Sequence, residues 1–301
     1  MTSAKQTVVI LNNASGSGHG SDSVAAVEAE FRRFDQTPRV NCVESEAMEK
    51  AIESALHGGA DLIVIGGGDG TVSLAASVLA DTNATLGVLP LGTLNHFAKD
   101  QQIPLDLAGA VRTVVTGRVS HVDVGDVDGR VFINNSSLGI YPEIVRLRQR
   151  LSVGKWLGMA AATWMVLRRG SKLSIEITSD NKTRHYRTPF VFIGNNEYKV
   201  EGLEVGQRTS MQDGQLSVYT SRLAGRLGVL RLAFKSLFRT LRAGHEFDTE
   251  IAQTLVINSP RSRLRVAIDG EVCMRDTPLH YRSRAGALRV MVPRSQTADA
   301  G

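Results

Sequence analysis

The sequence has little cysteine, few aromatic residues and no long apolar run. Cys42 and Cys273 stand alone without the spacing of a metal site, so we expect a cytoplasmic setting and no disulfide framework. The longest apolar stretch, residues 156–167, is too short for a bilayer span of about 20 residues, and the first residues lack the apolar core of a secretory signal. Aromatic residues make up 5%, and no recognised RNA- or DNA-binding signature is present, so a nucleic-acid partner is not expected.

The charge balance indicates an acidic partner. The formal net charge is +5, the isoelectric point is near 9.4, and basic residues are concentrated on two amphipathic segments, residues 146–157 and 228–242. Such segments suit an anionic membrane surface, where each basic residue contributes about 1 kcal/mol. A core helix with a solvated basic back is the alternative. We expect a peripheral protein at the inner face of the membrane, while the sequence does not indicate an oligomeric state.

The most informative segment is a glycine-rich turn after an apolar strand. Residues 61–72 read Asp-Leu-Ile-Val-Ile-Gly-Gly-Gly-Asp-Gly-Thr-Val. The apolar part suits a parallel strand covered on both faces, and glycines let main-chain N–H groups approach a polyanion. Asp69 would repel bare phosphates unless it holds Mg²⁺ or a hydrogen-bond donor, so it favours a metal-nucleotide. A tight strand-to-helix turn is the plain structural alternative. The predicted binding residues are Gly66, Gly67, Gly68, Asp69, Gly70 and Thr71.

A second segment, residues 86–98, repeats this design of apolar strand, glycine and polar side chains. If residues 73–80 form the crossover helix, the two strands are parallel neighbours. Both loops then emerge at the carboxyl edge of one sheet, where α/β folds bind ligands. Gly92, Thr93 and Asn95 would face a nucleotide there, although Thr93 or Asn95 could simply cap the following helix. A third such turn, residues 12–18, follows the apolar residues 7–11, so three strand-to-loop junctions converge.

The pattern of elements changes near residue 122, which predicts two domains, 1–121 and 122–293, and a tail, 294–301. The first part alternates strands and helices, as an α/β domain does. The second is mostly alternating strands joined by turns, which favours an antiparallel β-sandwich. We expect helical insertions at about 141–169 and 223–243. The predicted strands are 7–11, 39–43, 62–65, 85–89, 121–127, 130–134, 172–179, 183–193, 215–219, 250–258, 263–268 and 288–292, and the predicted helices of the first part are 21–34, 46–57, 71–80 and 105–116.

The three turns carry Asn-x-x-Ser-Gly, Gly-Gly-Asp-Gly-Thr and Pro-Leu-Gly-Thr-x-Asn-x-Phe-Ala. In this order and spacing they resemble the diacylglycerol kinase catalytic-domain family, nearest to its soluble bacterial lipid kinases. The resemblance spans nearly the whole chain, because later motifs match at residues 134–139, 194–196, 213–216 and 268–271. It implies an α/β nucleotide-binding domain, a β-rich lipid-substrate domain and an active site in the interdomain cleft. It also implies ATP and Mg²⁺ as cofactors and adds Asn12, Ser15 and Gly16 to the nucleotide-binding residues.

Asp269-Gly270-Glu271 is the candidate catalytic motif of the second domain. On sequence alone it is an ordinary hairpin turn after the strand 263–268. The resemblance implies instead that a carboxylate here accepts the proton of the attacking lipid hydroxyl, and either Asp269 or Glu271 could do so. Phosphoryl transfer depends mostly on positioning and charge neutralisation, so we expect Asp69, which orients the metal-nucleotide, to count as catalytic too.

A second metal site is implied by the resemblance at Asp213, with the main-chain carbonyls of Ser210 and Gln215, since oxygen ligands suit a hard cation. A simple Asp-Gly turn is the alternative. The chain departs from the family nearby, where residues 199–203 replace the usual glycine pair, and this puts the metal site in doubt. It also has no threonine at residues 41–44, where many relatives place a nucleotide contact.

These observations predict an ATP-dependent lipid kinase that transfers the γ-phosphoryl group to a hydroxyl of a membrane lipid. The expected acceptor is diacylglycerol, which would give phosphatidic acid. An NAD kinase is the nearest enzymatic alternative, because that family also carries Gly-Gly-Asp-Gly-Thr. Its threonine- and serine-rich substrate motif has no counterpart in this chain. A membrane-bound, nucleotide-responsive regulator without activity is the non-enzymatic alternative, and the intact carboxylates Asp69, Asp269 and Glu271 weigh against it.

Overall fold

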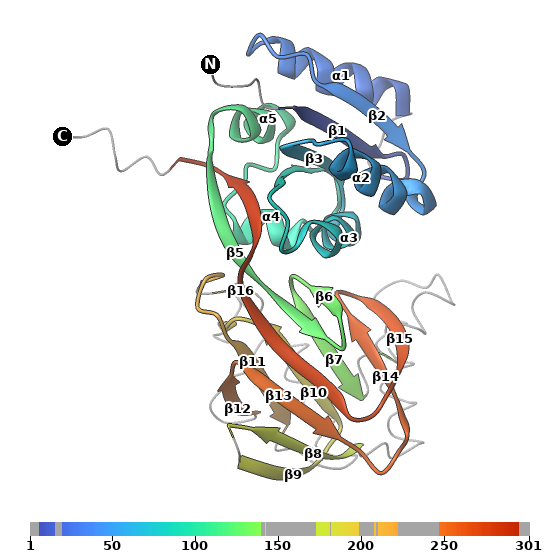
Figure 1. Ribbon diagram of the computed structural model, residues 1–301, viewed down its shortest axis with the longest axis vertical. Coiled ribbons are helices and arrows are strands. Elements are labelled where there is room, and N and C mark those ends of the chain that lie inside the picture. Colours follow the sequence, from blue (N-terminus) through green and yellow to red (C-terminus); the bar gives the residue numbers. More distant parts are fainter. Residues whose placement is uncertain are drawn as a thin grey trace, which may run out of the picture. The chain divides into compact units, whose positions relative to one another are not determined.

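The computed structural model describes residues 6–15, 20–139, 142, 173–180, 182–198, 208, 210–221 and 247–294. The chain divides into two compact units (Figure 1). Unit 1 comprises Met1–Val124 and Gly286–Gly301, and unit 2 comprises Gly125–Ala285. The first division lies close to the change of pattern at residue 122. The second lies within the last strand, several residues before the boundary at 293 that the sequence suggests.

Unit 1 is built on a parallel sheet. Strands β1 (Thr7–Asn12), β2 (Arg39–Val43), β3 (Leu62–Gly67) and β4 (Thr85–Pro90) lie in the order β2-β1-β3-β4, each pair parallel. Every residue of β3 and β4 is buried, as a parallel strand covered on both faces requires. The predicted parallel pairing of these two strands is therefore confirmed, and their carboxyl ends lie at the same edge of the sheet.

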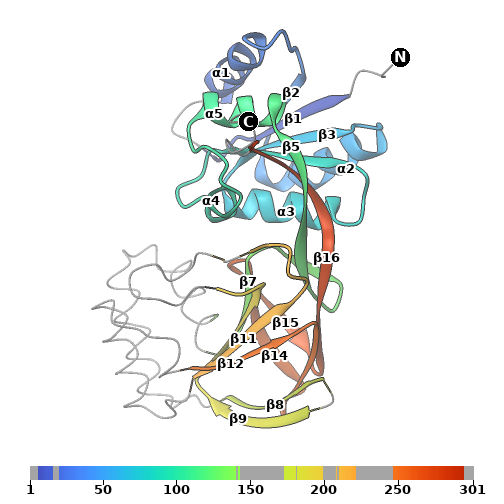
Figure 2. The ribbon, with the colours of Figure 1, turned by 90° about the vertical axis from the view of Figure 1, so that its left-hand side faces the viewer.

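Helices cover both faces of this sheet (Figure 2). Helices α1 and α5 lie on one side, and α2 and α3 lie on the other. Helix α5 begins after Asp106, whose carboxylate accepts the Gly109 N–H at 2.8 Å and caps the first turn. The helices of unit 1 are α1 (Gly20–Arg32), the 3₁₀ turn η1 (Ser45–Ala47), α2 (Met48–His57), α3 (Asp69–Leu79), α4 (His96–Asp100) and α5 (Leu107–Thr116).

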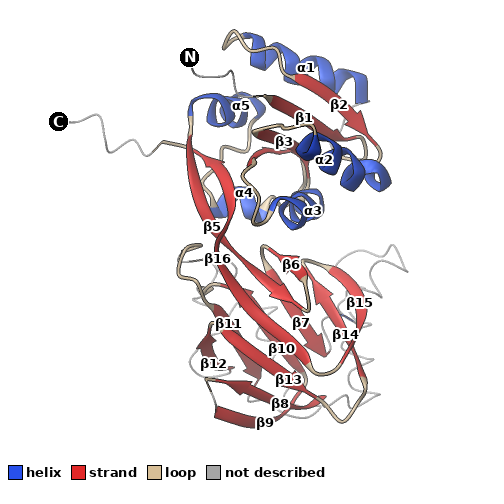
Figure 3. Cartoon of the chain, viewed as in Figure 1, coloured by secondary structure: helices blue, strands red, loops and turns tan. Residues whose placement is uncertain are grey.

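Unit 2 is an antiparallel β-sandwich (Figure 3). One sheet has the order β12-β11-β10-β7-β14-β15, and the other contains β16-β13-β8-β9 with β5 and β6 beside β16. Apolar residues such as Leu138, Val191, Ile257 and Tyr281 form one core cluster. The predicted fold class, an α/β domain plus a mainly antiparallel β domain, is confirmed. The strands are β5 (Arg118–Val127), β6 (Arg130–Phe132), β7 (Asn135–Gly139), β8 (Leu173–Ser179), β9 (Lys182–Thr188), β10 (Phe190–Asn195), β11 (Leu216–Ser221), β12 (Phe247–Ala252), β13 (Thr254–Asn258), β14 (Arg263–Ile268), β15 (Glu271–Asp276) and β16 (Leu279–Val292).

Several predicted strand boundaries of the second part are wrong. The single strand expected at 183–193 is two strands, β9 and β10, because Pro189 lies between them and proline cannot donate to a ladder. The single strand expected at 250–258 is likewise two, β12 and β13, which pair in different sheets. Strand β15 and the first half of β16 were not expected, since their sequences are rich in charged residues and lack a regular apolar alternation.

Strand β16 contributes to both units. Residues Leu279 to Arg282 pair antiparallel with β13, and Arg289 and Val290 pair parallel with β4. The last residues of β16 therefore complete the parallel sheet of unit 1 instead of ending the sandwich. The expected helical insertions at 141–169 and 223–243, which hold both basic segments, lie outside the described residues apart from residue 142. Within the part of the chain that the structure describes, no helix has the length and apolar character of a membrane span.

Candidate active site

The glycine-rich turn joins the end of β3 to the start of α3. Strand β3 continues through Gly67, beyond the end of the predicted strand 62–65, and α3 begins at Asp69, so Gly70 and Thr71 lie in its first turn. Gly68 is the N-cap residue and offers no side chain to the first N–H groups of the helix. Uncapped N–H groups and the helix dipole make such an end suitable for an anion.

The glycines of this turn and of the loop after β4 fall into two groups, according to whether a side chain would have space at the position. A Cβ added to Gly66 would lie 2.4 Å from a methyl group of Leu11, and one added to Gly67 would lie 2.6 Å from Cβ of Thr71. A Cβ on Gly92 would lie 2.4 Å from Cα of Gly68. These three positions require glycine because protein atoms pack against them. The sequence instead suggests that the glycines are there to give phosphates access to the main chain. A Cβ on Gly70 would meet no atom within 4 Å, and one on Gly68 would make only an ordinary contact of 3.5 Å with Cα of Gly92. Of these glycines, Gly70 and Gly68 therefore leave space for a ligand.

Asn12 and Thr71 form a buried hydrogen bond between two of the three turns. The Asn12 Nδ2 group donates to Thr71 Oγ1 at 2.9 Å, and Asn12 Oδ1 accepts the Ala14 N–H and the Ser45 hydroxyl, both at 3.0 Å. The Ala14 contact fixes which end of the amide is oxygen. Because Thr71 accepts the amide proton, its own hydroxyl proton is directed elsewhere and is available to a phosphate oxygen.

Asp69 lies half-buried beside the first turn of α4. Its Oδ1 accepts the Phe97 N–H at 3.4 Å. From the sequence, Asp69 is expected to hold either Mg²⁺ or a hydrogen-bond donor, and Phe97 supplies such a donor. A carboxylate has about four lone-pair positions, and this long bond uses one. The geometry therefore leaves Asp69 able to hold a cation as well. It also ties the glycine-rich turn to the loop that follows β4.

Asn95 holds that second loop in shape. Its backbone is left-handed, with φ 50 and ψ 47, and its Oδ1 accepts the Gly92 N–H at 3.1 Å. Its Nδ2 donates to the carbonyls of Gly92 at 2.8 Å and Pro90 at 3.3 Å. The side chain makes no capping bond to α4, so the alternative of a simple helix cap is wrong for Asn95. Thr93, by contrast, is exposed to solvent.

The structure thus places most of the predicted nucleotide-binding residues together at the carboxyl edge of the unit 1 sheet. Ser15 closes the first turn, where its N–H donates to the Asn12 carbonyl at 3.0 Å. Gly16 lies outside the described residues. The group at this edge consists of Asn12, Ser15, Gly66, Gly67, Gly68, Asp69, Gly70, Thr71, Gly92, Thr93 and Asn95.

In unit 2, Asp269 anchors a neighbouring strand. Its Oδ2 accepts the Ile133 N–H at 2.8 Å, and its Oδ1 accepts the Asn134 and Asn135 N–H groups, both at 2.9 Å. Asp269 and Gly270 are the two-residue loop of the β14–β15 hairpin and have φ values of 46 and 87, as a type I′ turn requires. The hairpin reading from sequence is correct in geometry. Three main-chain donors occupy most of the lone-pair positions of Asp269.

The four later motifs meet at one end of the six-stranded sheet. Strand β7 begins there, and β10 and β14 end there. Asn195 donates through Nδ2 to the Ile133 carbonyl at 3.1 Å, and the Asn196 N–H donates to the Gln215 carbonyl at 2.9 Å. Segments far apart in sequence therefore converge on the Asp269 turn. We call this group the Asp269 cluster; it consists of residues 133–135, 195, 196, 215 and 269.

Glu271 begins β15 and differs from Asp269 in its surroundings. Its side chain is 68% exposed and forms an ion pair with Arg130 of β6. An exposed pair of this kind contributes little to stability, about 0 to 1 kcal/mol. Of the two carboxylates, Glu271 is therefore the more exposed, and Asp269 is half-buried.

The proposed second metal site is only partly built by the described residues. Asp213 is exposed, Gly214 has a φ of 66, and the Ser210 hydroxyl accepts the Gln212 N–H at 3.1 Å. The Gln215 carbonyl already accepts the Asn196 N–H, which leaves it one lone pair. Among the residues described, no three side chains of His, Cys, Asp or Glu lie close enough to hold a metal ion. Any ion at Asp213 must depend on carbonyls and water.

Arg208 is a residue of this region that the sequence did not point to. Its guanidinium group donates to the Ile133 carbonyl and, at 3.1 Å, to Asn134 Oδ1, and it lies over the Tyr198 ring at 5.5 Å from the centroid. Tyr198 in turn donates its hydroxyl to the Asn134 carbonyl at 2.9 Å. Arg208 lies outside every motif, so no local signal in the sequence marks it. It packs against the same strand start that Asp269 holds.

Comparison with known proteins agrees with the motifs. Residues 6–127 match the model of the diacylglycerol kinase catalytic domain. A probable lipid kinase YegS-like of Pseudomonas fluorescens (strain Pf-5) is 30% identical over 288 residues, which cover 89% of this chain and 90% of the relative. The diacylglycerol kinase of Bacillus subtilis (strain 168) is 28% identical over 279 residues, with the same coverage of 89% and 90%.

A crystal structure of a diacylglycerol kinase from Bacillus anthracis str. Sterne has the same fold. Its TM-score is 0.69 at 19% identity, and the match covers 96% of this chain and 97% of that one. At this identity the likeness concerns the fold alone, whereas the sequence match to the Pseudomonas protein runs through both units. The chain therefore belongs to the diacylglycerol kinase catalytic-domain family, together with the YegS-like lipid kinases of bacteria.

Proposed function

We propose that this protein transfers the γ-phosphoryl group of ATP to a hydroxyl group of a membrane lipid, with diacylglycerol as the acceptor and phosphatidic acid as the product. Family membership makes the chain a lipid kinase, that is, a phosphotransferase with an alcohol group as acceptor. The observation that supports the nucleotide assignment best is the uncapped start of α3, where Gly68 and Gly70 leave space beside Asp69 and Thr71.

The phosphates of the nucleotide would lie at this helix start. The main-chain N–H groups of residues 68–71 and the Thr71 hydroxyl are donors of the kind that bind phosphate oxygens. The loops after β3 and β4 can approach each other only if residue 92 is glycine, because a Cβ there would collide with Cα of Gly68. Thr93 is exposed at the same edge and would contact the nucleotide from the second loop. Ser15 and Asn12 would support the first turn.

Magnesium would be held by Asp69 together with nucleotide phosphates. Mg²⁺ in kinase sites is commonly bound by one or two carboxylates plus phosphate oxygens and water, so a single carboxylate suffices. Asp69 fits this role because one long hydrogen bond leaves most of its lone pairs for other partners. The ion supplies charge neutralisation, while Asp69 itself supplies position: its bond to the Phe97 N–H fixes one oxygen and aims the other.

For the acceptor side we infer that Glu271 accepts the proton of the lipid hydroxyl and that Asp269 positions it. Asp269 is engaged by three main-chain N–H groups, while Glu271 is exposed. Arg130 forms an ion pair with the Glu271 carboxylate and so helps to orient it. Asp269 shapes the type I′ turn that sets where Glu271 begins β15.

Three further parts of the proposal concern the surroundings. A structural divalent ion would be held at Asp213 with the carbonyls of Ser210 and Gln215. The enzyme would be cytoplasmic and attached to the inner face of an anionic membrane, with lipid as its partner. The basic segments at 146–157 and 228–242 would make that contact. No nucleic-acid partner is proposed.

Incubation with γ-labelled ATP, Mg²⁺, NAD and a total lipid extract, followed by mass identification of the labelled product, tests the proposal. Label in phosphatidic acid in the organic phase is the expected result. Label that enters the aqueous phase as a phosphorylated dinucleotide would support the NAD kinase alternative. ATP binding without any labelled product across a broad lipid panel would support a non-catalytic regulator.

A further inference from the structure

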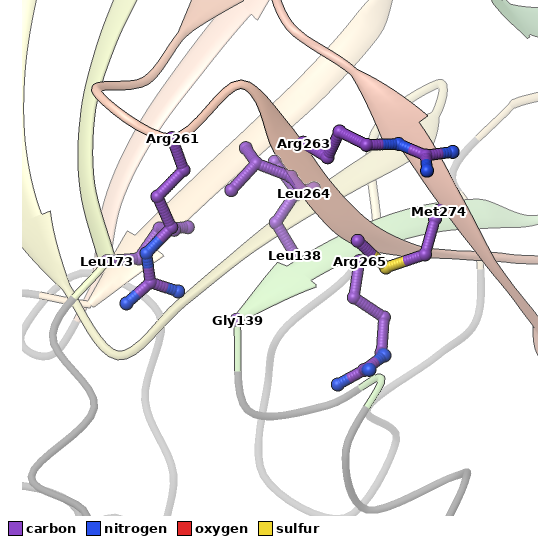
Figure 4. Close-up of a pocket in the computed structure, with 8 residues that line it drawn as sticks. All are labelled: Leu138, Gly139, Leu173, Arg261, Arg263, Leu264, Arg265 and Met274. Atoms are coloured by element: carbon purple, nitrogen blue, oxygen red, sulfur yellow. The ribbon is translucent and has the colours of Figure 1, made fainter.

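Unit 2 has a hollow of about 260 Å³ at the end of its sandwich, lined in part by Leu138 and Gly139 of the motif at residues 134–139. Among the described residues, its lining combines apolar side chains with three arginines (Figure 4). In this view Arg261 and Arg265 extend in the same direction, with Leu138 and Leu264 between them, while Arg263 points away. The lining residues are Leu138, Gly139, Leu173, Arg261, Arg263, Leu264, Arg265 and Met274.

The hollow lies at the opposite end of the strands from the Asp269 cluster. The hollow is lined by residues at the start of β14 and at the end of β7. The Asp269 cluster lies at the other end of these strands, because Asp269 follows the end of β14 and residues 133–135 precede or begin β7. Five residues of extended chain separate Leu264 from Asp269, which is about 16 Å. A ligand in the hollow is therefore not the group that receives the phosphoryl transfer at Glu271, and the hollow is a second site.

The two kinds of lining residue define the chemistry of an occupant. Leu138, Leu173 and Leu264 belong to the apolar core between the two sheets, and Met274, opposite Arg265 in the ladder, is 44% exposed. Arg263 forms an ion pair with Asp276 at 3.0 Å. Arg261 stands in the exposed turn before β14. The combination is complementary to an amphiphile with an anionic head and an apolar chain.

We propose that this hollow, the arginine pocket, binds the headgroup and upper acyl chain of an anionic phospholipid and so docks unit 2 on the bilayer. A guanidinium group binds a phosphate in a bidentate manner and remains charged at all physiological pH values. The terminal methyl of a substrate chain is a poorer occupant, because it would bring an apolar end against arginines. The pocket requires neither ATP nor the kinase assignment, so its test is independent of both.

Vesicle co-sedimentation of the full chain tests the pocket, with phosphatidylcholine vesicles compared with vesicles that also contain phosphatidylglycerol. The wild-type protein should bind only the second kind. The double variant Arg261→Gln/Arg265→Gln should lose at least about tenfold in affinity for them. The matched control Lys50→Gln/Lys182→Gln removes the same charge from two exposed residues that are not among those lining the pocket, and it should change affinity less than about twofold. Equal binding by the double variant and the wild type would overturn the proposal.

Two further measurements separate the pocket from a merely basic surface. Met274→Gln leaves the charge unchanged and should weaken binding by a few fold, because it removes an apolar contact with the chain; no change would overturn the acyl-chain part. Inorganic phosphate should displace the protein no more than sodium chloride of equal ionic strength, and a specific effect of phosphate would mean that the pocket takes a free anion. If the double variant unfolds, Arg261→Gln alone, in an exposed turn, should still lose several fold, and unchanged binding would again overturn the proposal.

Discussion

The glycine-rich turn of unit 1 and the Asp-Gly-Glu turn of unit 2 each contain one motif aspartate with different surroundings, Asp69 and Asp269. Asp69 makes one hydrogen bond of 3.4 Å to the Phe97 N–H. Asp269 accepts three, all between 2.8 and 2.9 Å, from residues 133–135. The same residue type in a motif therefore has two physical roles. Most lone-pair positions of Asp69 remain available to a ligand, whereas those of Asp269 are mostly occupied by main-chain N–H groups of the protein.

The largest effect should come from Asp69. Replacing it by alanine removes the carboxylate proposed to hold Mg²⁺, and we expect a loss of turnover of about 1000-fold, because phosphoryl transfer depends on charge neutralisation. Unfolding temperature should change little, since only one long bond is lost. Labelled-phosphate transfer to lipid and a thermal melt measure the two quantities. Asp22→Ala on the exposed side of α1 is the control and should leave both unchanged. Full activity in Asp69→Ala would remove the metal assignment.

The second effect concerns Glu271. Glu271→Gln keeps size and polarity but cannot accept a proton, so turnover should fall about 100-fold, in the range of general-base catalysis. Its free energy of unfolding should change by less than about 1 kcal/mol, because the ion pair with Arg130 is exposed. Steady-state kinetics and urea denaturation measure the two quantities. A variant with wild-type turnover would show that Glu271 is not the base.

The third effect reverses this pattern at Asp269. Asp269→Ala leaves three main-chain N–H groups without their carboxylate, and we expect the free energy of unfolding to fall by about 2 kcal/mol. Urea denaturation of Asp269→Ala and Glu271→Gln side by side measures the contrast. Asp269→Asn, which retains one acceptor oxygen, should recover part of the lost stability. If Asp269→Ala is as stable as the wild type, the anchoring role is wrong.

The smallest effect separates the two classes of glycine. Gly92→Ala forces a methyl group against Cα of Gly68 and should lower the free energy of unfolding by about 1 to 3 kcal/mol. Gly70→Ala points a methyl group into open space in the first turn of α3, so stability should stay the same or rise by about 0.5 kcal/mol, while ATP binding weakens. Chemical denaturation and nucleotide titration of both variants give the comparison. Equal stability losses would contradict it.

The sequence predicted the parts of this protein that depend on local pattern. Apolar runs ending in glycine identified the strands of unit 1, and their parallel pairing followed from the crossover helix. It could not predict which atoms pack against Gly66 or Gly92, because Leu11 and Gly68 become neighbours only in the folded sheet. For the same reason the return of β16 to β4 was not foreseen. The paired residues Val290 and Leu86 are separated by about two hundred positions, and no local signal links them.

The Asp269 cluster shows a similar limit. The motifs themselves were visible, yet Asp269 and Glu271 could not be told apart, because both are carboxylates beside the same glycine. Their difference depends on residues 133–135, more than a hundred positions earlier in the chain. Arg208 was missed altogether, since it acts through the Ile133 carbonyl and the Tyr198 ring and belongs to no motif.

Calorimetric titration of the wild-type protein and Asp69→Ala with ATP, with and without Mg²⁺, tests the central claim most directly. The claim is that the start of α3 binds a triphosphate and that Asp69 holds its metal ion. We predict heat of binding for the wild type that depends on Mg²⁺, and a loss of that dependence in Asp69→Ala. ATP uptake that is equally tight without Mg²⁺, or no uptake by the wild type at all, would contradict the account.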